Sequence, residues 1–168
     1  MQKRSFEKLI GNLEEITKQY RLLLDCVRKE KEYLIQSNNE KLNESNALKE
    51  QILSKIKTVE NARLDSASDL AQILGADHEA PRLLELAQKI GGAEADRLRS
   101  IHSTLELLIK RLVDINRDNA VYAESALNIV NSAMDNIKES LMGQKTYQKK
   151  GKYEQGYDKS GHLVSKEA

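Results

Sequence analysis

The chain has 168 residues, of which 32% are charged and 4% are aromatic, with one proline and no tryptophan. This composition is typical of long solvated helices that pack along narrow aliphatic seams. A formal net charge of +1 gives no general attraction to nucleic acid or to anionic membranes. The single cysteine, Cys26, excludes an internal disulfide, and neither a signal peptide nor an apolar run of membrane-spanning length is apparent. We therefore expect a cytoplasmic protein without membrane insertion.

The first predicted helix covers residues 5–35, and its seam positions alternate three and four residues apart, as in coiled coils. Ser37 and Glu40 have the spacing of a capping box, which predicts a second helix over residues 38–74. The short connection makes these two helices antiparallel neighbours. The first seam comprises Phe6, Leu9, Leu13, Ile16, Tyr20, Leu23, Val27, Glu30 and Leu34.

Glycine and proline mark the next boundaries. Gly75 is placed to cap the end of the second helix. A short third helix is predicted over residues 80–90, with Pro81 tolerated in its opening turn, and Gly91-Gly92 ends it.

The last predicted helix, residues 93–142, carries eleven consecutive seam positions of which only Asn119 is polar. We interpret Asn119 as the point where the internal bundle ends and a wetter surface begins; the alternative is a buried residue that fixes helix register. The positions are Leu98, Ile101, Leu105, Leu108, Leu112, Ile115, Asn119, Tyr122, Ala126, Ile129 and Ala133.

Together these elements predict an all-α fold: an elongated antiparallel up-down helical bundle, or coiled coil, of three long helices plus one short helix. The bundle would occupy residues 1–142. Residues 143–168 contain six basic and three acidic residues and four glycines. With so little apolar surface to offset the entropy of ordering, this second segment is predicted to be a disordered basic tail.

The helix lengths do not match. At 1.5 Å per residue, the last helix would be about 75 Å long and its neighbours about 45 and 55 Å. About thirteen residues at its end, 129–142, would then lack a partner inside the molecule, although they are rich in aliphatic side chains. A foreign helix could cover them, as could the chain itself or a second copy in a homodimer.

No constellation in the sequence favours catalysis. The histidines, His78, His102 and His162, are not preceded by the glutamate that an inward Glu-x-x-His metal motif requires. Gly91-Gly92 lacks the lysine and hydroxyl residue of a phosphate-binding loop. We expect no enzyme activity, no metal and no cofactor.

Several features in order resemble FlgN-type flagellar export chaperones. One is the segment from Val59 that ends at Arg63. Another is the pair Asn116 and Asn119, which leads into Ala126-Leu127-x-Ile129. The last is a Tyr-x-x-x-Gly that begins at Tyr147.

This resemblance implies a cytoplasmic type III secretion chaperone for the hook–filament junction proteins, hook-associated proteins one and three. Such a chaperone prevents premature assembly and delivers its clients to the export gate or to export ATPase components. By position, the resemblance assigns Tyr147 to docking at the export gate; the alternative is that Tyr147 closes the helix end. It assigns to client contact the residues Ile129, Val130, Met134, Ile137 and Leu141.

The sequence is also compatible with two functions other than a chaperone. The chain could be a structural coiled-coil subunit that binds one permanent partner along its whole length. Alternatively, Lys145, Lys149, Lys150 and Lys152 could tether it to an anionic membrane or to nucleic acid. Because three acids offset the six basic residues of the tail, we expect no nucleic-acid partner.

Overall fold

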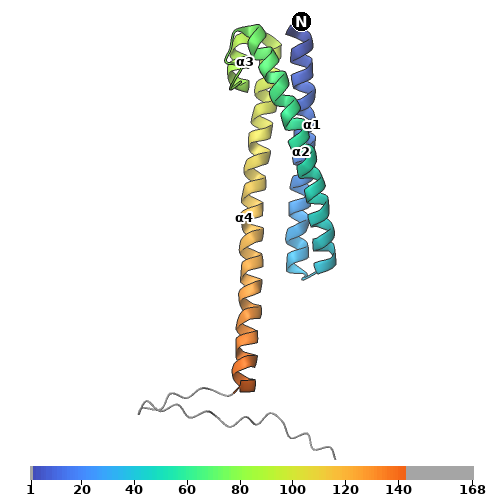
Figure 1. Cartoon of the computed structure of the whole chain (residues 1–168), viewed down its shortest axis with the longest axis vertical. Helices are drawn as coiled ribbons and strands as arrows, with labels where there is room; N and C mark the ends of the chain where they lie inside the picture. Colours follow the sequence, from blue (N-terminus) through green and yellow to red (C-terminus); the bar gives the residue numbers. More distant parts are fainter. Residues whose placement is uncertain (1, 143–168) are drawn as a thin grey trace, which may run out of the picture. The chain divides into compact units, whose positions relative to one another are not determined.

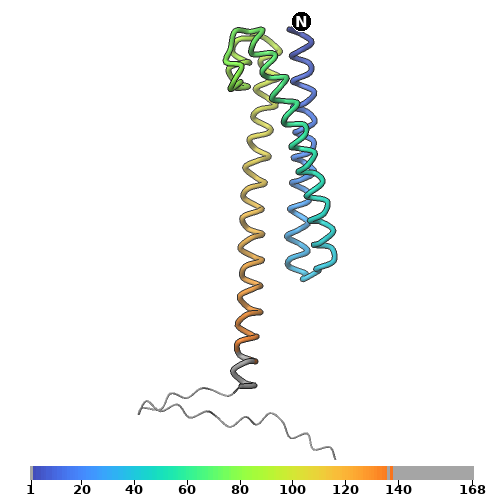
Figure 2. Tube along the Cα trace, in the orientation of Figure 1, coloured from blue at the N-terminus to red at the C-terminus, as the bar shows by residue number. Residues whose placement is uncertain are grey.

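The computed structural model in Figure 1 describes residues 2–142, except the side chains of residue 136 and residues 138–142. The predicted disordered tail, residues 143–168, lies outside the described residues. Within them the chain forms four helices and no strand: α1 (Gln2–Ile35), α2 (Asn39–Leu74), α3 (Leu83–Ile90) and α4 (Gly92–Met142). The trace in Figure 2 follows this order. The predicted all-α fold of three long helices and one short helix is confirmed.

By its internal contacts the chain falls into two units, residues 1–122 and residues 123–168. The division lies within α4, after Tyr122. The domain boundary expected after residue 142 coincides with the end of the described residues, so it stays a prediction.

In the first unit α1 and α2 run side by side in opposite directions (Figure 1). Asn12 Nδ2 donates a hydrogen bond to Ser66 Oγ at 2.9 Å. Farther along α1, Cys26 Sγ lies 3.2 Å from Ser45 Oγ. These contacts pair the start of α1 with the end of α2, as the short connection predicted.

The turn between α1 and α2 differs from the predicted capping box. Asn38 is the N-cap of α2, and its side-chain oxygen accepts a hydrogen bond from the backbone N–H of Lys41 at 3.1 Å. Ser37 instead adopts a left-handed backbone with φ 53°. The N–H of Asn38 reaches back to the carbonyl of Tyr33 at 3.0 Å, which is the Schellman closure of a helix C-terminus. Ser37 therefore ends α1 rather than starting α2.

The end of α2 is as predicted, whereas the start of α3 is not. Gly75 caps α2 with φ 64°, a conformation that glycine adopts without steric cost. Pro81 lies before α3 and not in its opening turn, because α3 begins at Leu83. Asp77 Oδ1 accepts from the N–H groups of Glu79 and Ala80. This loop, together with the bias against helical backbone before a proline, delays the helix.

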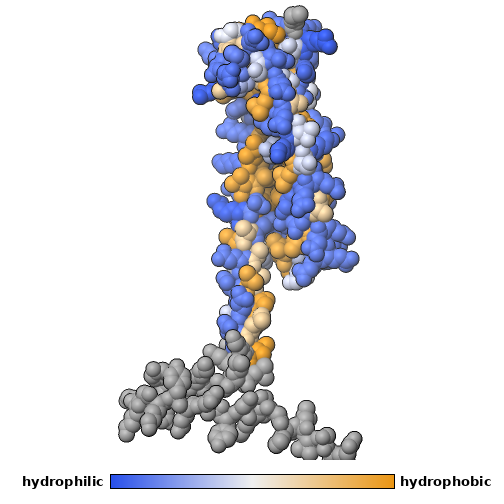
Figure 3. Space-filling model, viewed as in Figure 1, coloured by the Kyte–Doolittle hydropathy of each residue, from blue (hydrophilic) through white to orange (hydrophobic). Residues whose placement is uncertain are grey.

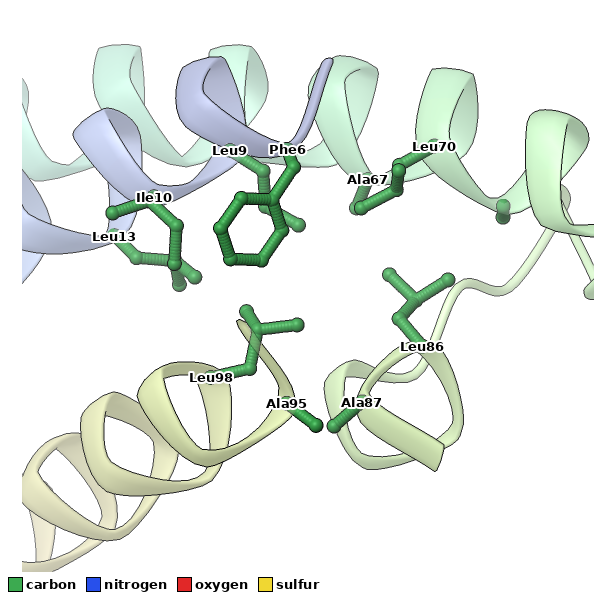
Figure 4. Close-up of a cluster of buried hydrophobic side chains, with 11 residues drawn as sticks. Phe6, Leu9, Ile10, Leu13, Ala67, Leu70, Leu86, Ala87, Ala95 and Leu98 are labelled. Carbon is green, nitrogen blue, oxygen red and sulfur yellow. The ribbon is translucent and has the colours of Figure 1, made fainter. Parts of the chain in front are cut away.

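The core of the first unit is largest where all four helices meet. Figure 4 shows side chains from α1, α2, α3 and the start of α4 pointing toward one another. The first residues of α4 lie beside α1, since Arg97 pairs with Glu14 at 2.8 Å. The buried members are Phe6, Leu9, Ile10, Leu13, Ala67, Leu70, Ala71, Leu86, Ala87, Ala95 and Leu98.

Farther along α4 the core becomes smaller. The second buried cluster contains Leu24, Val27 and Leu108, flanked by partly buried hydrophobic residues. Lys31 and Asp118 approach to 4.0 Å, so α4 runs in the same direction as α1 throughout this unit. The first unit is thus an up-down-up bundle whose core narrows along α4.

Candidate partner-binding surface

Among the side chains of α4 that the structure describes, Asn119 is the last buried one. It is 3% exposed, and its Nδ2 donates a 2.9 Å hydrogen bond to the carbonyl oxygen of Val27. Asn119 is therefore buried, as the alternative interpretation requires, and it also lies where the covered part of α4 ends. A helix backbone next to it provides an acceptor that sequence spacing does not reveal. The location was correct, since every described side chain after Asn119 is exposed.

The exposed part of α4 in the second unit carries the predicted client contacts. Ile129 is 71% exposed, Val130 54%, Met134 62% and Ile137 59%. Figure 3 shows hydrophobic side chains along this part of the helix. Of the other two predicted contacts, Leu141 lies in α4 with its side chain outside the described set, and Tyr147 lies outside the described residues.

These apolar side chains share one face of the helix. Val130, Met134 and Ile137 follow one another at spacings of four and three, and Ile129 lies beside them. At 3.6 residues per turn such positions form a continuous stripe. Ala126 and Ala133 lie on the same face, where their small side chains leave room for a partner's side chains.

Leu127 belongs to the same surface, although it was not among the predicted contacts. It is 59% exposed and precedes Val130 by three residues. The prediction followed the seam through Ala126 and Ile129 and so passed over its neighbour. The signal was present in the sequence, because Leu127, Val130 and Met134 repeat the same three-and-four spacing.

The surface has little charge. Between residues 123 and 137 the only ionisable side chains are the two carboxylates of Glu124 and Asp135. The remaining polar positions described there are amides and hydroxyls, such as Asn128, Asn131 and Ser132. A charge-poor apolar helix face is suited to packing against other helices.

Among the residues that the structure describes, no three or more His, Cys, Asp or Glu side chains come together as a group that could hold a metal ion. Cys26 is 4% exposed and contacts the backbone and hydroxyl of Ser45.

The pKa shifts belong to ion pairs of the bundle: a hydrogen bond from Lys55 lowers the pKa of Glu15, and one to Glu14 raises the pKa of Arg97. Within residues 2–142, no helix combines the length and the hydropathy that a membrane span requires.

A helical bundle that exposes a long apolar helix face defines a protein-binding module. A family model described as FlgN protein matches residues 1–155. The chain therefore belongs to the FlgN family and is a flagellar export chaperone, which confirms the resemblance seen in the sequence. Neither the curated proteins nor the solved structures contain a match.

Proposed function

We propose that this chaperone binds the terminal helical segments of hook-associated proteins one and three through the exposed apolar face of α4. The contacts are Ile129, Val130, Met134, Ile137 and Leu141. The chaperone acts in the cytoplasm, prevents premature assembly of these junction proteins and delivers them to the export gate or to export ATPase components.

One observation carries the proposal: four of the five contact side chains are more than half exposed. Full burial of one large aliphatic side chain stabilises a complex by about 1.5–3 kcal/mol. Apolar residues exposed together along one helix supply the binding energy for a partner helix. Met134 adds adaptability, because its flexible thioether fits different partner shapes.

Reversibility follows from the state of the client. A client segment that is disordered until it binds loses conformational entropy in the complex, which offsets part of the interaction energy. The complex can then dissociate at the export gate without a catalytic step. We assign docking at the gate to Tyr147, which the family match includes.

Truncation after Asn128 tests the proposed surface. Full-length and truncated chaperone are immobilised and exposed separately to purified hook-associated proteins one and three. We expect the full-length chain to retain both clients and the truncated chain to retain neither.

Circular dichroism of the truncated chain is the control, because both buried clusters lie before residue 123. We expect its helicity to fall only by the share of the removed residues. Retention of either client by a folded truncated chain would contradict the proposal.

A further inference from the structure

The first half of α2 shows how much of a helix one neighbour covers. This stretch, residues 39–59, lies against α1, with Lys49 Nζ at 2.6 Å from Glu30 Oε2. At about 100° per residue, its covered side chains span about 100° of the helix circumference. They are Leu42, Ser45, Lys49, Ile52, Ile56 and Val59.

The helix α1 shows what two neighbours cover. It contacts α2 through Asn12 and Ser66 and α4 through Val27 and Asn119. Beyond the cluster that α3 also lines, over residues 16–27, its buried side chains span about 180° of the circumference. They are Ile16, Thr17, Gln19, Leu23, Leu24, Cys26 and Val27.

The exposed face of α4 is wider than one neighbour can cover. Between residues 123 and 137 its apolar arc runs from Ile129 at one border to Leu127 at the other, about 160°. No polar residue of this stretch falls inside the arc. A single helix would leave one border partly exposed, as α1 leaves Leu48 and Leu53, beside the covered arc of α2, 50% and 48% exposed. A second copy of this chain that paired through its own α4 would also supply only one helix.

The two borders differ in charge. Glu124 and Asp135 project within about 20° of each other, about 16 Å apart along the helix. Both lie on the side of the Leu127 border. The polar positions next to the Ile129 border, Ser125 and Asn136, are uncharged. A helix at the Leu127 border would therefore be favoured by basic side chains on its outer edge.

We propose that the client covers α4 with two helices side by side, one at each border, and that the helix at the Leu127 border carries basic residues facing Glu124 and Asp135. This inference rests on the proposed function, because it specifies the partner of the same surface. The chaperone then supplies the third helix of a small bundle.

Thiol labelling across the face tests the number of helices. Leu127→Cys and Ile129→Cys place a thiol at the two borders, Ala126→Cys places one near the centre, and Asn128→Cys places one on the opposite face. Each full-length variant is labelled with a maleimide alone and with saturating hook-associated protein one, then with hook-associated protein three. The natural Cys26, 4% exposed, serves as the slowly reacting reference.

We expect labelling at the centre and at both borders to slow at least about tenfold, because at saturation less than about one-tenth of the chaperone is unbound and only that fraction reacts. Asn128→Cys should keep its rate. Protection of the centre and only one border would overturn the two-helix inference and leave the proposed function intact. No protection at any of these positions, with saturation established independently, would overturn both. Protection of both borders in the free protein that grows with its concentration would show that copies of this chain cover the face instead.

Charge reversal tests the basic helix. Glu124→Lys combined with Asp135→Lys should weaken client binding by about two- to thirtyfold, which corresponds to two exposed ion pairs. Glu106→Lys, an exposed position of α4 in the first unit, is the matched control and should leave the affinity unchanged. An unchanged affinity in the double variant would contradict the proposal that the client helix carries basic residues facing Glu124 and Asp135.

Discussion

Asn119 of α4 donates a 2.9 Å hydrogen bond from Nδ2 to the carbonyl oxygen of Val27 in α1. Its Oδ1 is buried and has no hydrogen-bond partner among the described residues. A buried acceptor left unpaired costs about 1–3 kcal/mol. The amide of Asn119 is thus held to α1 by a hydrogen bond from its nitrogen, while its oxygen is buried without a described partner.

Replacing Asn119 with leucine should therefore stabilise the protein. The change removes the unpaired acceptor and adds apolar surface at a buried position, for a gain of about 1 kcal/mol in the free energy of unfolding. Urea unfolding measures the gain. Client affinity should not change, because Asn119 faces α1. A lower urea midpoint for Asn119→Leu would show that the hydrogen bond to Val27 outweighs the unpaired oxygen.

Substitutions at the ends of α1 and α2 should have opposite effects on stability. Both ends close with a Schellman hydrogen bond, from the N–H of Asn38 to the carbonyl of Tyr33 and from the N–H of Ala76 to the carbonyl of Ala71. Ser37 has φ 53° and Gly75 has φ 64°. A residue with a Cβ is disfavoured in this region by about 1–2 kcal/mol. Ser37→Gly should raise the free energy of unfolding by about 0.5–1 kcal/mol, whereas Gly75→Ala should lower it by about 1 kcal/mol. Thermal melting of both variants measures these shifts, and a melting temperature lowered by Ser37→Gly would contradict the account of the turn.

The narrowing core predicts unequal costs for the same truncation along α4. Leu98 is fully buried in the cluster of eleven residues, whereas Leu108 is 9% exposed in the cluster of three. Leu98→Ala should lower the free energy of unfolding by about 3–5 kcal/mol, and Leu108→Ala should lower it by about 1–3 kcal/mol. Denaturant unfolding gives both values. Equal losses of stability would mean that the bundle is packed as tightly around Leu108 as it is around Leu98.

The ion pair of Glu15 predicts a pH dependence. Lys55 Nζ lies 3.0 Å from Glu15 Oε1, and this hydrogen bond, followed by one from Gln19, lowers the pKa of Glu15. A carboxyl whose pKa is lowered in the folded state adds stability above its ordinary pKa of about 4.3. That stability is lost as the pH falls through the lower folded value. Glu15→Gln should thus destabilise the protein slightly at pH 7 and less as the pH falls below about 4. Urea titrations at several pH values measure the difference in the free energy of unfolding between Glu15→Gln and the unchanged protein. A difference that grows toward acid pH would contradict this assignment.

Much of the fold could be predicted because helix length and seam spacing are local properties. Gly75 marked its helix end correctly, since only glycine enters the left-handed region freely. The capping serine was misplaced because Ser37 and Asn38 are both good N-caps, and the Schellman closure to Tyr33 decided between them. Pro81 was misplaced because Asp77 organises a loop that competes with the helix.

The candidate surface was predictable in position but not in extent. Exposure of Ile129 and Met134 could be expected from the mismatch of helix lengths. The burial of Asn119 could only be an alternative, because its hydrogen-bond partner is a backbone carbonyl ninety-two residues away in the chain. Leu127 was missed because a seam with one residue in each helical turn describes contact with a single neighbouring helix.

The most direct test of the central claim is the affinity of hook-associated proteins one and three for Met134→Asp combined with Ile137→Asp, measured by calorimetry. Asn128→Asp combined with Ser132→Asp is the matched control, since it adds the same charge on the opposite face of α4. The account predicts that the first variant binds at least about a hundredfold more weakly, because two apolar contacts become buried carboxylates, while the control binds normally and both variants keep their helicity. Undiminished binding by the folded Met134→Asp, Ile137→Asp chaperone would contradict the claim that this face of α4 holds the client.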